Sequence, residues 1–167
     1  MRTLHCDAPG VGTAFFRVPG SQAALQGVLK SVTPVAGWFR PAFRAAVKTR
    51  KLYDAGRALG VIRSRAQREE IETFLDALGR MDFRAYLQTL QGLMSASGSD
   101  VVAQVKVPVL VLAAQNDVLV TTRQLQALAA ALPRATYREF ADAGHAGMLE
   151  AGVEMAAEVR KFVNGLA

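Results

Sequence analysis

Residues 107–113, which read VPVLVLA, constrain the fold more than any other part of the chain. The stretch is rich in β-branched residues and is apolar at consecutive positions instead of alternate ones. A strand with this pattern must be covered on both faces, as are the strands of a parallel sheet flanked by helices. Pro108 is compatible with such a strand, because the hydrogen-bonded ladder can begin after it. The stretch therefore predicts an α/β protein.

The residues after this strand continue the alternation of strands and helices. Residues 114–117 predict a turn, and Thr121 or Thr122 can cap the helix that follows. A second strand is predicted at residues 136–140, followed by a glycine-containing loop and an amphipathic helix to about residue 163. A short strand is also expected near the N-terminus. The fold class is then α/β with about three parallel strands flanked by helices, near residues 3–6, 107–113 and 136–140.

Residues 21–98 are helical in character. Apolar side chains recur at helical spacing over residues 67–79, and Asp82 can cap the next helix. Three residues are expected to interrupt the chain before this region becomes helical again: Pro34, Gly37 and Pro41. We therefore expect an α/β core formed by residues 1–20 and 99–167, with a helical insertion between them over residues 21–98.

Basic residues are concentrated in this insertion, and the whole chain carries a formal net charge of +6. Residues 40–68 contain one acid, Asp54, against these Lys and Arg residues: Arg40, Arg44, Lys48, Arg50, Lys51, Arg57, Arg63, Arg65 and Arg68. Four of them follow helical spacing and are predicted to share one face: Arg40, Arg44, Lys48 and Lys51. A solvated surface is the common outcome for such a stripe, and the alternatives are attraction of an anionic substrate, a membrane surface or nucleic acid. No nucleic-acid-binding motif accompanies it, so we expect no nucleic-acid partner.

Composition and cysteine usage limit the class of protein. The chain has 167 residues, of which 51% are hydrophobic, which suits one domain with a buried core. Its longest apolar run, residues 107–114, is far shorter than the roughly 20 residues that span a bilayer, and no signal-peptide stretch opens the sequence. The single cysteine, Cys6, excludes an intrachain disulfide. We expect no membrane span and a location in a reducing cytoplasm.

Two polar residues follow the predicted strands. Asp117 comes after the strand at 107–113, and His145 comes after the strand at 136–140. Open parallel sheets place their sites outside the carboxyl ends of the strands, so the two loops can meet there. A carboxylate that accepts a hydrogen bond from one imidazole nitrogen fixes the tautomer and leaves the other nitrogen as a general base.

Plain structural roles are open for the same residues. Asp117 can be a turn residue that bonds its own backbone, and His145 can be an ordinary loop histidine. Gly144 and Gly147 flank His145 and favour unusual backbone angles or the close approach of another segment. An ordinary surface loop needs neither of these properties, which favours a functional histidine.

The stretch VPVLVLAAQNDVLV, the helix after it, and ADAGHAGMLE with its closing helix resemble the C-terminal portion of an α/β-hydrolase-fold protein. In that family the chain order is nucleophile, acid, histidine. The resemblance implies that Asp117 is the acid and His145 the catalytic histidine, and Glu150 matches the acidic residue that often follows. Ala114 stands where glycine is common. The helical insertion lies where the family places a cap over the active site.

Asp7 is a second candidate for the acid, because some members of the superfamily take their acid from the loop after the strand that we match to residues 3–6. The simpler interpretation is a turn residue before Pro9 and Gly10.

The resemblance fails at the nucleophile, because no G-x-S-x-G elbow is present. None of the serines has this context: Ser21, Ser31, Ser64, Ser95, Ser97 and Ser99. Cys6 lies at a predicted strand but has no elbow around it. We therefore expect a chain that lacks the N-terminal half of the fold and contains no nucleophile. A cut parallel sheet exposes unpaired N–H and C=O groups, so we also expect self-association through that edge.

The resemblance implies a parent activity, the hydrolysis of an ester or related acyl bond of a small apolar substrate by a nucleophile–His–Asp triad. This chain would be weak or inactive alone, and no cofactor or metal is expected. Trp38, Phe39 and Phe43 are candidates for the wall of an apolar pocket, although a place in the core of the cap is the simpler alternative. The alternative function is a non-catalytic ligand-binding or interaction module built on a degenerate hydrolase half.

Overall fold

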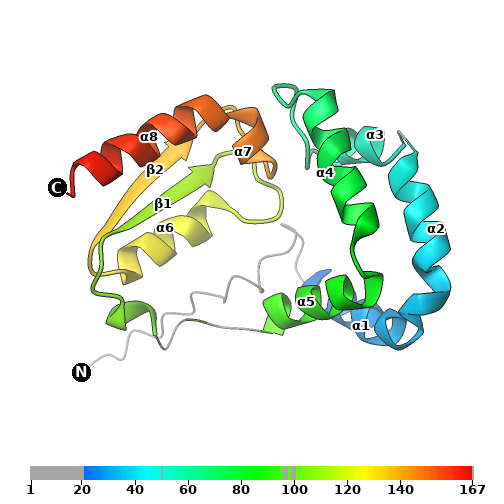
Figure 1. Ribbon diagram of the computed structural model, residues 1–167. Helices are drawn as coiled ribbons and strands as arrows, with labels where there is room; N and C mark the ends of the chain where they lie inside the picture. Colours follow the sequence, from blue (N-terminus) through cyan, green and yellow to red (C-terminus); the bar gives the residue numbers. More distant parts are fainter. Residues whose placement is uncertain (1–20, 50, 96–97, 99–100, 167) are drawn as a thin grey trace.

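The computed structural model describes residues 21–49, 51–95, 98 and 101–166, which form two parts that lie side by side (Figure 1). The helical segment, up to residue 95, contains α1 (Ser21–Val32), a 3-10 turn (Thr33–Val35), α2 (Ala36–Lys48), α3 (Lys51–Ala58), α4 (Arg68–Arg80) and α5 (Phe83–Ser95). The α/β unit, from residue 101, contains a 3-10 turn (Val102–Gln104), β1 (Val109–Ala114), α6 (Thr122–Ala131), β2 (Ala135–Phe140), α7 (Gly147–Glu150) and α8 (Gly152–Asn164).

The sheet of the α/β unit consists of β1 and β2, which pair in parallel. Val109 lies opposite Ala135 and Ala114 lies opposite Phe140, so both strands end at the same level. Helices α6 and α8 lie on opposite faces of the sheet (Figure 1). The α/β class and the strands predicted at 107–113 and 136–140 are confirmed, with small shifts of their ends. The third predicted strand, near residues 3–6, lies outside the described residues.

The apolar pattern of β1 explains why it is covered on both sides. Val111 and Ala113, which point to one face of the strand, are buried, and Leu110 and Leu112 on the other face are half-buried. Helix α6 begins with a capping box in which Thr121 and Gln124 bond each other's backbone N–H groups, as expected for a helix that starts after a tight turn. Strand β2 follows α6 directly and completes the parallel pair.

The helical segment has two small apolar cores. One joins α1, α2 and α5 around Leu29, Ala36 and Leu87. The other is built around Ile62, Ala66 and Ile71 and extends to Ala146 and Leu149 of the α/β unit. The second core therefore packs the α3–α4 loop, residues 59–67, against the loop that carries His145. No helix in the described ranges is long and apolar enough to cross a membrane.

Two local expectations about the helical segment are wrong. Helix α2 continues through both Gly37 and Pro41, although a proline inside a helix removes one backbone hydrogen bond and crowds the preceding turn. The backbone turns to an extended conformation at Thr49, with ψ of 136°. The four-residue basic face is therefore interrupted, since Arg40 and Arg44 belong to α2 whereas Lys51 begins α3.

Helix α3 ends in a Schellman motif at Gly60, which adopts a φ of 72°. The N–H of Gly60 donates to the carbonyl of Arg57, at 3.1 Å, and the N–H of Val61 donates to that of Gly56, at 2.9 Å. The motif turns the chain into the α3–α4 loop.

We expect Gly60→Ala to lower the free energy of unfolding by about 1 kcal/mol, because a side chain disfavours the left-handed conformation. A Cβ at this position would lie 3.6 Å from Cγ1 of Val118, an ordinary contact, so the cost comes from the backbone alone. Gly27→Ala is the matched control: it lies inside α1, and apart from the adjoining backbone of that helix no atom of the described residues lies within 4 Å of the added Cβ. This change should stabilise the helix by about 0.5–1 kcal/mol. Urea denaturation measures both, and equal stability of Gly60→Ala and wild type would contradict the assignment.

Candidate active site

The candidate site forms where β1 and β2 end. The parallel register brings Ala114 and Phe140 to the same edge of the sheet, which is where open parallel sheets bind ligands. After β1 the chain makes a tight turn, in which the N–H of Asp117 donates to the carbonyl of Ala114 at 3.2 Å. After β2, residues 141–146 form the loop that contains His145.

Asn116 ties these two loops together. Its backbone N–H donates to the carbonyl of Ala143 at 2.9 Å, and its side-chain amide donates to the carbonyl of Ala141 at 2.6 Å. No sequence motif identifies Asn116 as a site residue, and its position directly before Asp117 is the one indication of its role. The amide therefore sets the distance between the loops from which Asp117 and His145 project.

Asp117 and His145 are in direct contact. Nδ1 of His145 lies 3.1 Å from Oδ2 of Asp117 and 3.2 Å from Oδ1. Asp117 is buried, with 8% of its surface exposed, whereas 42% of the His145 side chain is exposed. Among the described residues, Nδ1 of His145 has Asp117 as its hydrogen-bond partner, and Nε2 has no hydrogen-bond partner. An imidazole held in this way keeps its proton on Nδ1 and presents the Nε2 lone pair outward.

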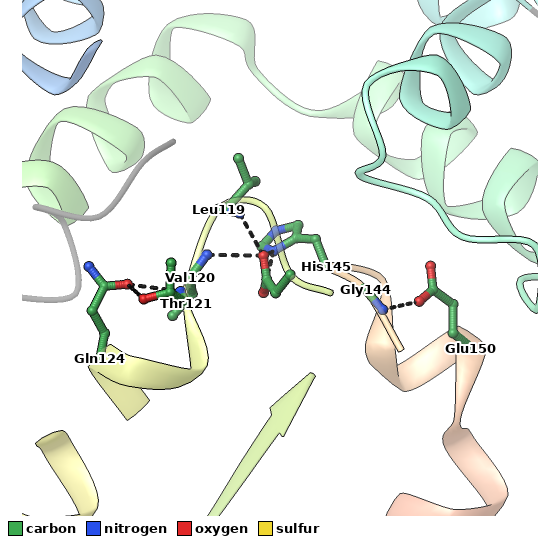
Figure 2. A network of polar contacts seen from close by, with 8 residues as sticks. Leu119, Val120, Thr121, Gln124, Gly144, His145 and Glu150 are labelled. Atoms are coloured by element: carbon green, nitrogen blue, oxygen red, sulfur yellow. Dashed lines mark hydrogen bonds and ion pairs between the residues drawn. The ribbon is translucent and has the colours of Figure 1, made fainter. Parts of the chain in front are cut away.

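Asp117 also bonds its own turn, so the turn role is present together with the contact to His145. Its Oδ1 accepts hydrogen bonds from the N–H of Leu119 at 2.7 Å and from the N–H of Val120 at 2.9 Å (Figure 2). These bonds fix the carboxylate in one orientation before it meets the imidazole. The hydrogen bonds of the turn therefore orient the carboxylate of Asp117 toward His145.

The contact shifts the pKa values of both groups. Burial acts to raise the pKa of Asp117, but the hydrogen bond from His145 and those from the N–H groups of Val120 and Leu119 lower it below its usual value. The pKa of His145 is raised, first by its hydrogen bond to Asp117, against the opposing effect of burial, and further by the negative charges of Asp117 and Glu150. Both shifts favour the ion pair over the neutral pair.

The glycines on either side of His145 are closely packed. A Cβ on Gly144 would lie 2.6 Å from Cγ of Arg63 and 3.2 Å from Oε2 of Glu150. A Cβ on Gly147 would lie 2.9 Å from Cε of Met155. Neither glycine has a positive φ among the described residues. Of the two reasons offered for these glycines, close approach applies and special backbone angles do not.

Glu150 lies behind the His145 loop. Its side chain is buried, and its carboxylate accepts a hydrogen bond from the N–H of Gly144 (Figure 2) and one, at 2.7 Å, from the N–H of Arg63. The sequence alone identifies Glu150 only as a match to the acidic residue that often follows the histidine in the α/β-hydrolase family. The spacing from His145 could suggest that Glu150 is near the loop, but no sequence signal points to Arg63.

The remaining candidates are dispersed. Phe43 stacks on Phe83, with ring centroids 4.4 Å apart, and so belongs to the packing between α2 and α5. Trp38 is 88% exposed and Phe39 is 49% exposed on α2. Asp7 and Cys6 lie outside the described residues, and no cluster of His, Cys, Asp or Glu within the described ranges could hold a metal ion.

We expect His145 to titrate above the ordinary histidine value, and Asp117→Asn to move its pKa back toward that value. The wild type should gain most stability over Asp117→Asn between about pH 3.9 and 6.5, the pKa values of the unfolded groups. The gain should decline as the pH rises through the folded pKa of His145, and as it falls through that of Asp117. NMR of the imidazole and urea denaturation measure these effects. Asp142→Asn, which removes an exposed carboxylate of the same loop, should change neither, and an unshifted His145 in Asp117→Asn would contradict the pairing.

Comparison with known proteins identifies the architecture. No protein-family model matches the sequence, and a search of curated proteins gave no significant match. Among solved structures, an esterase from Exiguobacterium antarcticum is similar with a TM-score of 0.62 at 11% identity, over 83% of this chain and 48% of that one. A thermophilic esterase from Thermogutta terrifontis is similar with a TM-score of 0.56 at 15% identity, over 91% of this chain and 53% of that one. A protein described as a non-heme bromoperoxidase from Mycobacterium tuberculosis H37Rv is similar with a TM-score of 0.60 at 19% identity, over 92% of this chain and 56% of that one.

These proteins share the α/β-hydrolase fold, and the chain spans about half the length of each. At these levels of identity the similarity establishes the fold. The chain therefore has the fold of the C-terminal portion of an α/β-hydrolase.

Proposed function

We propose that Asp117 and His145 are the acid and the base of a nucleophile–His–Asp triad. In this proposal the triad hydrolyses an ester or related acyl bond of a small apolar substrate. The observation that carries the proposal is the 3.1 Å contact between Nδ1 of His145 and Oδ2 of Asp117 at the carboxyl ends of two parallel strands. The similarity to two esterases supports the class of reaction.

The chemistry assigned to each group follows from the geometry. Asp117 keeps the proton of His145 on Nδ1, so Nε2 is free to take a proton from an attacking hydroxyl group. As the tetrahedral intermediate collapses, the same nitrogen returns the proton to the leaving alkoxide. The negative charge of Asp117 stabilises the imidazolium between these two steps, which agrees with the raised pKa of His145.

The helical segment is the proposed cap of this site, with residues 1–20 and 99–167 as the core. Contact of the α3–α4 loop with Ala146, the residue before α7, and with Leu149 inside α7 supports this role. The exposed rings of Trp38 and Phe39 provide apolar surface for a substrate. Phe43 is the weaker pocket candidate, because its ring is already stacked on Phe83.

A complete triad also needs a nucleophile and donors for the oxyanion. No serine of this sequence stands in a G-x-S-x-G elbow, and the chain spans about half of the similar structures. We therefore assign the nucleophile to the half of the fold that this chain does not span, and we expect only slow ester hydrolysis from the chain by itself. The missing elbow is also the observation that favours the alternative function, a non-catalytic binding module.

We expect the chain to hydrolyse p-nitrophenyl butyrate slowly, and His145→Ala to reduce the rate to that of buffer. Without a serine, His145 would act on water, and the rate should rise as the pH passes through its pKa, because only the neutral imidazole accepts a proton. Absorbance of p-nitrophenolate measures the rate.

His5→Ala is the matched control, because it removes the other histidine of the chain and should keep the rate. Equal rates in wild type and His145→Ala, both above that of buffer, would refute the assignment of the base. A wild-type rate equal to that of buffer would favour the non-catalytic alternative.

A further inference from the structure

Glu150 is a buried carboxylate whose two oxygens are used by different parts of the molecule. Only 4% of its surface is exposed. Oε2 accepts a hydrogen bond from the N–H of Gly144, the residue before His145, and Oε1 accepts one from the N–H of Arg63 at 2.7 Å. Gly144 belongs to the His145 loop, and Arg63 belongs to the α3–α4 loop of the helical segment. A single side chain thus joins the two backbones.

The packing around Glu150 makes this junction tight. Cγ of Arg63 would be 2.6 Å from a Cβ on Gly144, so the absence of a side chain there lets the α3–α4 loop come close. Ile62 and Ala66 on the α3–α4 loop share an apolar core with Ala146, the residue after His145. Both neighbours of His145 are therefore close to the helical segment.

The energetics of a buried carboxylate make the junction cooperative. Burying a carboxylate is costly unless its charge is compensated, and hydrogen bonds from N–H groups to an ionised oxygen are short and strong. Across the described ranges, no cation lies within ion-pair distance of Glu150, so these two N–H groups are the direct partners of its charge, with Arg65 and His145 interacting with it from farther away. Withdrawal of the α3–α4 loop would remove the hydrogen bond from the N–H of Arg63. The buried carboxylate would then be less well compensated, and its hydrogen bond with Gly144 would be weakened.

We propose that Glu150 is a positioning residue that makes the orientation of His145 depend on the docking of the α3–α4 loop. The helical segment and the His145 loop then move as one unit. The inference rests on the proposed function of His145 as the base, but it concerns the placement of the imidazole and not turnover.

Glu150→Gln tests the proposal, because glutamine has one acceptor oxygen and an amide that cannot accept the second N–H. We expect the amide protons of Gly144 or Arg63 to exchange about tenfold faster with solvent, the effect of losing a hydrogen bond to a charged group. The imidazole signals of His145 should shift, and its titration should move to lower pH. NMR of the folded chain measures all three without substrate, so an inactive chain would not affect the result.

Glu154→Gln is the matched control. Glu154 in α8 forms an ion pair with Arg65 that also joins the helical segment to the α/β unit, but its contact does not reach Gly144. We expect this variant to leave the imidazole signals of His145 unchanged. If Glu150 only connected the two parts of the molecule, Glu150→Gln and Glu154→Gln would have the same effect on the imidazole signals of His145.

Ile62→Ala provides a second test that leaves Glu150 intact. It loosens the α3–α4 loop through the apolar core, and we expect it to move the imidazole signals of His145 in the same direction as Glu150→Gln. Should Glu150→Gln fail to fold, this variant decides the question. The proposal is overturned if either folded variant weakens the docking of the α3–α4 loop, seen as faster exchange at Arg63, while the imidazole signals remain those of wild type. Unchanged protection of both amides in Glu150→Gln also overturns it.

Discussion

Parallel pairing of β1 with β2 is the constraint on which the rest of the site depends. Because both strands run in the same direction and end at the same level, the loops after Ala114 and Phe140 leave the sheet together. Asn116 then bonds the backbone of the opposite loop twice. The Asp117–His145 contact follows from this geometry. An antiparallel pair would place the two loops at opposite ends of the sheet.

Two buried carboxylates near this edge are stabilised in different ways. Asp117 accepts backbone N–H groups from its own turn and an imidazole from the neighbouring loop. Among the described residues, Glu150 accepts hydrogen bonds from two backbone N–H groups, one from each part of the molecule. Asp117 therefore acts on a group that can gain or lose a proton, whereas Glu150 acts on the backbone that carries that group. Both contribute to the raised pKa of His145.

The local signals of the sequence were dependable for the elements of the α/β unit. The apolar run predicted β1, and the capping residues at Thr121 and Asp82 begin helices as expected. Local signals failed where the result depends on a neighbouring segment. Pro41 does not end α2, and the reason for Gly144 is the approach of Arg63 from another part of the chain. Arg63 acts through its backbone N–H, and Asn116 acts through its N–H and its side-chain amide on the backbone of another loop. No side-chain pattern reveals these contacts.

The sequence by itself determined the class of fold, the order of strands and helices, and the pair Asp117 and His145 as candidates. Periodicity and chain order suffice for these, because they arise from burial of each element and from the direction of neighbouring strands. The tertiary structure decided which atoms meet: Nδ1 of His145 on the carboxylate of Asp117, and Glu150 between Gly144 and Arg63. The physical reason is that hydrogen bonds between segments 87 residues apart depend on packing at the ångström scale, which the pattern of one segment does not contain.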